Sequence, residues 1–234
     1  MIIIDPGHGG SDPGARSQDG KIREKDLNLS LAGLIAARLA GIPVLLTRTE
    51  DITLEPAERT RLIREAGARV CLSVHHNAFN GQARGMETIH SIHSDGRLAR
   101  LLFDRIKEAG MPGRRVFSRK SGQQAGKDFY FIIRDTRPVE TVIVEYGFVD
   151  NADDLRLLTD PAVREKMAAA TAAAVRQYLG TAAATDGEVE ILASGKVLRG
   201  KLLDGVSYAP VRELATALGR QVLWDGRRVI IGEE

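Results

Sequence analysis

Cysteine is nearly absent from this sequence, in which Cys71 is the only one among 234 residues. A single thiol excludes an internal disulfide and any zinc site built from several thiolates. The sequence also lacks an apolar run long enough to span a membrane. Its net charge is only +2 and forms no evident basic face, so nucleic-acid binding is not indicated.

No signal peptide precedes the first apolar segment, so we expect a protein made in the cytoplasm. What is present is ordinary for a soluble globular protein, with 43% hydrophobic and 27% charged residues. There is enough apolar material for a sizeable core. The length allows one large domain, or a large one with a small one.

Apolar periodicity predicts strands alternating with helices through most of the chain. Such alternation is typical of an α/β domain, a mainly parallel twisted sheet with helices on both faces. The polar, turn-rich span 112–127 is predicted to be a mobile loop. We expect helices at 24–39, 55–66, 98–106 and 161–179, and strands at 2–4, 44–46, 70–75, 85–92, 129–133 and 141–145.

The composition changes after residue 180. Residues 181–187 contain no large apolar side chain and read as a linker between a domain at 1–180 and another at 188–234. In the second domain, Asp204-Gly205 and Asp225-Gly226 lie between apolar runs and predict hairpins. A helix is expected to begin at Pro210. This unit would be a small α+β domain with little core of its own, which leans on the first domain or pairs with a second copy.

The opening stretch Ile2–Gly10 joins a β-branched strand to a glycine-rich turn that holds His8. A histidine just after a buried strand is well held for metal ligation or acid–base chemistry. Taken alone, the stretch is better explained by an ordinary histidine in a surface turn. Partners elsewhere in the chain must decide.

Candidate partners also lie where elements begin or end. Glu24 opens a helix, where a carboxylate is favoured in any case. His75 and His76 end a strand, and only one of them can face a given site because successive strand side chains alternate. Glu145 follows a strand buried on both faces, where an unpaired charge is costly. The remaining histidines, His90 and His93, alternate with polar residues and are expected to be solvated.

Two histidines, a ligand carboxylate and a second glutamate are typical of a catalytic zinc site with an open fourth position for water. The second glutamate would act as general base and then as acid. No HExxH motif is present, which excludes the thermolysin-like helical arrangement. Here the candidate ligands come from separate elements, so spacing alone is a weaker signal.

Residues 2–179 closely resemble the catalytic domain of zinc-dependent N-acetylmuramoyl-L-alanine amidases, the amidase 3 family. The matching blocks are Ile4–Ala15, Glu24–Leu29, Leu46–Arg48, Ser73–Ala78, Gly85–Thr88 and Val144–Asn151. Their number, order and spacing make chance agreement implausible.

The resemblance implies that His8, Glu24 and His75 hold Zn²⁺ and that Glu145 is the catalytic glutamate. His76 stands where the family commonly has alanine, so it is not expected to be a ligand. Arg134 and Asn77 match positions that we place near the substrate.

The family's reaction is cleavage of the amide between the lactyl group of N-acetylmuramic acid and L-alanine of the peptidoglycan stem peptide. Zinc would activate water and polarise the carbonyl. Glu145 would take the water's proton and pass it to the departing nitrogen.

Residues 188–232 resemble the stalk-type repeat named after the copper amine oxidase N-terminal domain, on Asp204–Leu214, Ala217–Gly219 and Val222–Asp225. Beside an amidase, this suggests a wall-anchoring or self-association module, and its name is no argument for copper.

Two other classes stay open. The chain could be a catalytically silent wall-binding or scaffolding protein, which the loss of any of the four site residues would favour, or a zinc amidase or peptidase with another substrate. As a wall amidase it would be a phage lysin, an enzyme that lyses its own mother cell, or a secreted enzyme whose signal peptide was removed.

Overall fold

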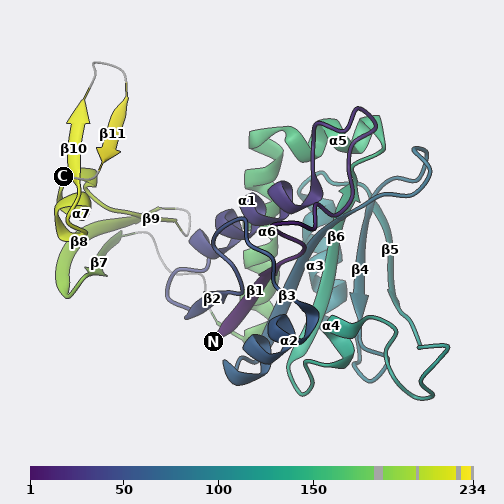
Figure 1. The fold of residues 1–234 in the computed structure, drawn as a ribbon. Coiled ribbons are helices and arrows are strands. Elements are labelled where there is room, and N and C mark those ends of the chain that lie inside the picture. The colour runs from purple at the N-terminus through teal and green to yellow at the C-terminus, as the bar shows by residue number, and fades with distance from the viewer. Residues whose placement is uncertain (182–186, 204–205, 225–227, 233–234) are drawn as a thin grey trace. The chain divides into compact units, whose positions relative to one another are not determined.

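The computed structural model describes all residues except 182–186, 204–205, 225–227 and 233–234. Two compact units follow one another, Met1–Ala182 and Ala183–Glu234 (Figure 1). The first unit holds, in chain order, β1 (Ile2–Pro6), α1 (Glu24–Ala37), β2 (Val44–Leu46), α2 (Pro56–Glu65), β3 (Val70–Asn77), β4 (Met86–His90), α3 (Arg97–Glu108), β5 (Gly113–Ser118), α4 (Phe131–Arg134), β6 (Glu140–Phe148), α5 (Ala152–Thr159) and α6 (Pro161–Leu179).

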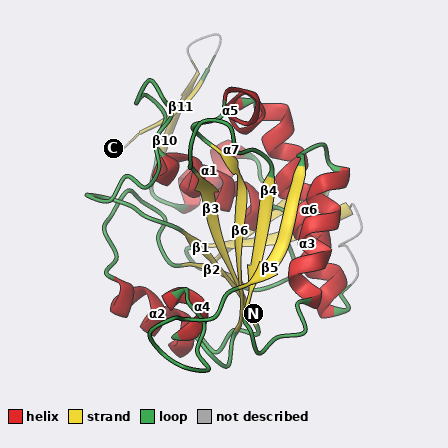
Figure 2. Cartoon of the chain, turned by 90° about the vertical axis from the view of Figure 1, so that its right-hand side faces the viewer, coloured by secondary structure: helices red, strands yellow, loops and turns green. Residues whose placement is uncertain are grey.

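A six-stranded sheet in the order β2-β1-β3-β6-β4-β5 forms the centre of this unit. Strands β2, β1, β3 and β6 run parallel, β4 runs antiparallel to β6, and β5 is parallel to β4. Helices cover both faces of the sheet (Figure 2). The predicted α/β fold is therefore confirmed. The carboxyl ends of β1, β3 and β6 meet at one edge, where α/β folds build their sites.

Alternate residues of the strands enter two separate cores. Ile2 and Ile4 of β1 contribute to a large core that includes residues of α1, α3 and α6. Ile3 of β1 and Cys71 of β3 contribute to a smaller one with residues of α2 and α4. Because side chains alternate along a strand, an inner parallel strand must be apolar on both faces. We call the side with α2 and α4 the α2/α4 face; His75 and Glu145 lie on it.

Helix α6 begins and ends at the residues that its sequence predicts. Asp160 is the N-cap, and its carboxylate accepts hydrogen bonds from the backbone N–H groups of Ala162 and Val163. Pro161 takes the first helical position, and Gly180 ends the helix with a left-handed φ of 70°. No helix in the described ranges is long and apolar enough to cross a lipid bilayer.

The predicted strand at 129–133 is wrong, because residues 131–134 form the short helix α4. Its apolar, partly β-branched sequence is typical of a strand. However, Ile132 and Ile133 are consecutive and both buried, at 4% and 2% exposure. A strand with one solvated face buries only alternate residues, whereas a helical turn can place both against the sheet.

The predicted loop at 112–127 is also wrong in part, because it contains the strand β5. This strand lies at the edge of the sheet and is mostly exposed, so it shows no apolar pattern. Helix α5 was not predicted. Asn151 caps it by accepting hydrogen bonds from the N–H groups of Asp153 and Asp154.

The second unit is small and of α+β type. Its elements are β7 (Gly187–Ala193), β8 (Lys196–Leu203), β9 (Val206–Tyr208), α7 (Val211–Ala217), β10 (Gln221–Trp224) and β11 (Val229–Gly232). Strands β7-β8-β9 form a three-stranded sheet and β10-β11 a two-stranded sheet, all paired antiparallel.

The buried apolar cluster of the second unit is small and is centred on Ala193, Leu198 and Ala217. The predicted turn residues Asp204-Gly205 and Asp225-Gly226, and the linker residues 182–186, lie outside the described residues.

Candidate metal centre and active site

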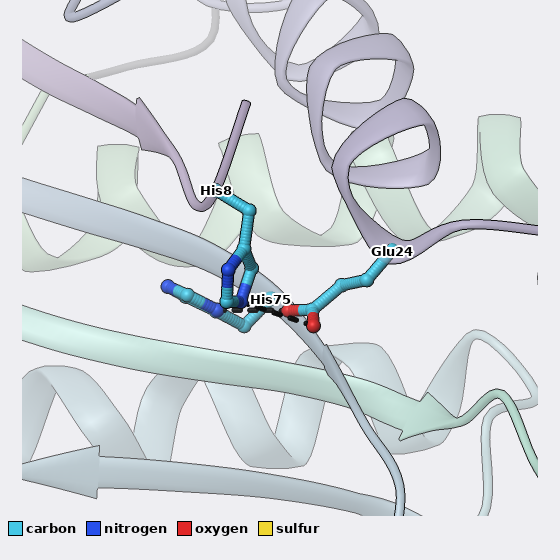
Figure 3. Close-up of side chains that lie close together, drawn as sticks. All are labelled: His8, Glu24 and His75. Carbon is cyan, nitrogen blue, oxygen red and sulfur yellow. Dashed lines mark hydrogen bonds and ion pairs between the residues drawn. The ribbon is translucent and has the colours of Figure 1, made fainter. Parts of the chain in front are cut away.

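Glu24 is the hub of a cluster at the carboxyl edge of the sheet (Figure 3). Its Oε2 lies 3.0 Å from Nε2 of His8, and its Oε1 lies 2.9 Å from Nδ1 of His75. The three side chains each offer a ligand atom, and these atoms all lie within 4.8 Å of one another. Three elements that are distant in sequence therefore bring two imidazoles and one carboxylate together.

Two glycines allow this close approach. A Cβ added to Gly7 would lie 2.1 Å from Cε1 of His75, and one added to Gly14 would lie 2.4 Å from Oε2 of Glu24. Both contacts are far inside van der Waals distance, so no other residue fits at either position without displacing a member of the cluster. The glycine-rich opening stretch is thus a steric requirement of the cluster as well as a turn.

His8 has an unusual backbone conformation, with a φ of 59°. This left-handed region is rare for residues other than glycine and persists only where neighbours hold it. Here two buried arginines hold the turn. Arg59 donates to the carbonyl oxygens of Pro6 and His8, at 2.9 and 3.0 Å, and Arg48 donates to those of Pro6 and Gly7, at 3.1 and 3.0 Å.

Asp5 anchors one of these arginines beneath the site. It is 1% exposed, and its Oδ1 accepts hydrogen bonds from Arg59 Nη1 and Thr47 Oγ1, both at 2.6 Å. Ser73 donates to the other oxygen at 2.9 Å. This network was not predicted, because its only signal in the sequence is an aspartate at the end of an otherwise apolar strand.

The charges of the cluster support one another. Burial alone would raise the pKa of Glu24, but the hydrogen bonds and charges of His75 and His8 outweigh it and bring the pKa well below its usual range. Burial alone would lower the pKa of His8. Glu24 and Asp12 outweigh it and raise that pKa to about 9. Asp12 accepts a 2.7 Å hydrogen bond from Nδ1 of His8, which leaves Nε2 directed at Glu24.

The donor set fits a zinc ion. Two histidines and one glutamate are a known catalytic zinc set, and a ligand histidine generally donates its other ring N–H to a carboxylate, as His8 does to Asp12. Glu24 is held from behind by the N–H groups of Ala15, at 2.8 Å, and His76, at 3.1 Å.

His76 lies on the opposite face of β3. Its Nδ1 is 2.7 Å from Oδ1 of Asn28 on α1, its ring lies beside that of Tyr146, and it is 2% exposed. Burial lowers its pKa to about 3, so it is neutral. It takes no part in the cluster.

Glu145 lies beside the cluster on the neighbouring strand. In the parallel register of β3 and β6 it is paired with His75, so both side chains occupy the α2/α4 face. Its Oε2 is buried and has no hydrogen-bond partner among the described residues. Burial raises its pKa to about 7, which is the range of a general base at neutral pH.

A cavity of about 380 Å³ opens in front of these residues on the α2/α4 face. His8, His75 and Glu145 line it, together with residues of the loop before α2 and of the segment 130–132. It is the size of a small-molecule or peptide subsite. A substrate carbonyl placed there would face both the cluster and Glu145.

The other predicted residues lie outside this cavity. Arg134 forms a bidentate ion pair with Asp135, at 2.9 Å for each bond, and donates to the carbonyl of Phe129. Asn77 donates to Glu87 at 3.5 Å. His90 and His93 contact backbone carbonyls and do not join the cluster.

Comparison with known proteins places the chain among wall amidases. Residues 2–177 match the family model described as N-acetylmuramoyl-L-alanine amidase. The N-acetylmuramoyl-L-alanine amidase AmiA of Escherichia coli is 25% identical over 224 residues, covering 76% of this chain and 75% of AmiA. The endolysin of Bacillus phage SPP1 is 32% identical over 170 residues, covering 68% of this chain and 58% of the endolysin.

Solved structures agree with the sequence comparison. The catalytic domain of CwlV, an N-acetylmuramoyl-L-alanine amidase from Bacillus (Paenibacillus) polymyxa var. colistinus, has a TM-score of 0.70 at 26% identity. The alignment covers 77% of this chain and 98% of that domain. The similarity therefore spans the first unit and a whole catalytic domain.

Proposed function

The chain belongs to the family of N-acetylmuramoyl-L-alanine amidases that act on peptidoglycan, and from this we propose that it cleaves the N-acetylmuramic acid–L-alanine amide by zinc-dependent hydrolysis. His8, Glu24 and His75 would hold the metal, and Glu145 would be the catalytic base. The observation that carries this proposal is the buried Oε2 of Glu145, which has no hydrogen-bond partner in the described part of the chain and lies one strand from His75.

Zinc bound by the three residues would polarise the substrate carbonyl and lower the pKa of the attacking water. Glu145 accepts the proton of that water through Oε2. The same carboxyl group then delivers the proton to the alanine nitrogen, which leaves as an amine. A pKa of about 7 suits both steps, because the group can gain and lose a proton near neutral pH.

The remaining residues orient this machinery. Asp12 accepts from His8 Nδ1 and so sets the tautomer and the ring direction. Arg48 and Arg59 hold the backbone of the turn through its carbonyl groups. Gly7 and Gly14 leave room for His75 and Glu24.

A silent wall-binding protein is the weaker alternative. Placing a carboxylate in an apolar strand without a hydrogen-bond partner destabilises the fold, since burying a polar group without a partner costs about 1–3 kcal/mol. A binding protein gains nothing from such a buried carboxylate. A general base does, because the same burial raises its pKa toward neutral pH. A hydrolase with another amide substrate would share the same chemistry. The identity of the amino terminus released from peptidoglycan distinguishes it from an N-acetylmuramoyl-L-alanine amidase.

The C-terminal unit, residues 188–234, would serve as a wall-anchoring or self-association module joined by a linker at 181–187. It carries none of the proposed site residues. The enzyme would act at the cell wall, in keeping with the name of one relative, the probable cell wall amidase LytH of Staphylococcus aureus.

The deciding experiment measures new amino-terminal alanine released from purified peptidoglycan, alongside the zinc content of the protein. We expect about one zinc per chain, release of alanine without new reducing sugar ends, and loss of activity on chelation with recovery on adding zinc. Full activity in metal-free protein would overturn the zinc mechanism. Release of a different amino terminus would assign another substrate.

A further inference from the structure

A row of polar side chains crosses four adjacent strands at one level of the α2/α4 face. Glu145 on β6 is paired in register with His75 on β3 and with Glu87 on β4. Glu87 is paired in turn with Arg115 on β5, at the edge of the sheet. Residues paired in this way share a face, with Cβ atoms about 5 Å apart. The row therefore leads from the metal centre to an exposed edge.

Glu87 in this row is buried and fully engaged. It is 2% exposed, and its Oε1 accepts hydrogen bonds from Arg114 Nη1 and, at 2.8 Å, from Arg115 Nε. Two guanidinium groups face one carboxylate, which leaves an excess of one positive charge. The Arg115 side chain is 53% exposed, so its outer N–H groups face solvent and can bind an anion.

A second arginine continues this surface. Arg115, Phe117 and Arg119 occupy alternate positions, and each guanidinium lies over an aromatic ring, Arg115 over Phe117 at 4.2 Å and Arg119 over Phe129 at 3.7 Å. Stacking on a ring holds a guanidinium in place and leaves its N–H edge free to donate. We call Arg115 and Arg119 the arginine band.

The arginine band is connected to the catalytic cavity. Arg119 stacks on Phe129, and the ring of Phe129 packs edge-to-face against that of Tyr130, with the ring centroids 5.0 Å apart. Tyr130 lines the cavity together with His75 and Glu145. A ligand that crosses from the cavity to β5 therefore meets the band directly.

The surrounding segment is strongly basic. Residues 113–137 carry seven lysines and arginines but two aspartates, whereas the whole chain has a net charge of +2. Asp128 is buried and accepts from Ser91 and Ile92, and Asp135 is paired with Arg134, so neither faces the band. The net charge of the whole chain does not reveal this segment, because acidic residues elsewhere balance it in the total.

We propose that the arginine band binds the free carboxylates of the stem peptide, and so orients the peptide half of the substrate across β4 toward β5. The proposal rests on the proposed function. In the substrate, the lactyl carboxyl group and the alanine amino group are both consumed in the scissile amide. The N-acetylated sugars are then uncharged, while the peptide keeps a free carboxyl end. Charge therefore distinguishes the two halves.

The distances are compatible with this placement. Arg115 lies two strands from Glu145, which is about 10 Å at the usual strand spacing. An extended peptide advances about 3.5 Å per residue. A carboxylate about three residues beyond the scissile amide would thus reach Arg115, and one farther along would reach Arg119.

The test compares two soluble muropeptides that differ only in whether their stem carboxyl groups are free or amidated. KM and kcat are measured for the zinc-loaded wild type, Arg115→Gln, Arg119→Gln and the double variant. The control is Arg105→Gln, a similarly exposed arginine on α3, at 46%. For the free-acid substrate we expect KM to rise about two- to fivefold in each single variant and about tenfold in the double, with kcat nearly unchanged. The amidated substrate and the control should show no change.

Arg115 also neutralises Glu87, so its variant could lose stability. Arg119 has no contact with Glu87 among the described hydrogen bonds, and Arg119→Gln therefore tests the band without that complication. Equal KM changes for both muropeptides would overturn the proposal. The proposal would also be overturned if the arginine variants discriminated normally between the two muropeptides but lost binding to intact walls that bear an anionic polymer.

Calorimetric binding to the Glu145→Gln variant separates this proposal from the proposed function. If the wild type cleaves neither muropeptide, yet the free-acid form binds more tightly through the two arginines, the function fails and the band stands. If cleavage is normal and binding does not depend on the arginines, the band fails and the function stands.

Discussion

His75 and His76 are consecutive residues whose imidazoles lie on opposite faces of β3. Nδ1 of His75 is 2.9 Å from Glu24 Oε1, whereas Nδ1 of His76 is 2.7 Å from Asn28 Oδ1 on α1. Strand alternation separates them, and the glycine at position 7 gives only His75 access to the cluster.

We therefore expect His75→Ala to lose zinc and His76→Ala to keep it. His76→Ala should instead lower the free energy of unfolding by about 1–3 kcal/mol, because it leaves the Asn28 oxygen buried without a partner. Zinc content and chemical denaturation measure the two effects. Reversed metal contents would mean that the other imidazole faces the site.

Glu145→Gln should keep zinc but lose turnover. The substitution preserves size and removes the proton acceptor, while His8, Glu24 and His75 are unchanged. Because general acid–base groups contribute about 100- to 10,000-fold, release of amino-terminal alanine should fall by at least that order. Near-normal release by the zinc-loaded variant would remove Glu145 from the mechanism.

Gly7→Ala should disrupt the proposed metal centre although it replaces none of the proposed ligands. Its Cβ would lie 2.1 Å from Cε1 of His75, so the imidazole or the turn must move. The matched control is Gly33→Ala in α1, where the added Cβ has no neighbour within 4 Å. That variant should keep zinc and gain about 0.4–1 kcal/mol of stability. A Gly7→Ala protein with full zinc and activity would contradict the steric argument.

The metal-free protein should show a pH dependence of stability that originates in His8. Burial lowers the pKa of His8, but Glu24 and Asp12 outweigh it and raise the pKa to about 9, against 6.5 for the free side chain. The folded state then binds the proton more tightly than the unfolded state. Its stabilisation is complete below pH about 6.5 and is lost as the pH rises through about 9.

The measurement compares chelator-treated wild type with His8→Asn, since asparagine tolerates the left-handed φ of 59°. The difference in their denaturation midpoints should shrink between pH 6.5 and 9.5. Zinc affinity should change in the opposite sense and rise with pH, because the metal needs the unprotonated imidazole. A difference that is constant with pH would exclude His8 as its source.

A chain ending at Ala184 should still fold and cleave soluble muropeptides, because every proposed site residue and both cores of the first unit precede that point. It should bind intact walls less well or change its oligomeric state. Sedimentation of the protein with walls and its mass in solution test the two roles. If neither changes, the C-terminal unit has neither proposed role.

Much of the fold follows from local sequence. The apolar runs of β1, β3 and β6 and the Asp160–Pro161 start of α6 predict their elements, because a strand buried on both faces and a capped helix leave a local signature. β5 and α4 leave none. An edge strand is solvated like a loop, and a four-residue helix is decided by what it packs against.

The sequence by itself determined which chemical groups are available: two imidazoles and two carboxylates, each at the end of an element, with glycines beside the first. Only the tertiary structure decided that three of these groups meet within 4.8 Å and that the fourth lies one strand away. It also decided that Arg48, Arg59 and Asp5 support the turn, and that Arg115 lies in line with Glu145. The reason is physical, because strand register and crossover connections bring together residues from 16 positions apart (His8 and Glu24) to 137 positions apart (His8 and Glu145), and no local pattern carries that pairing.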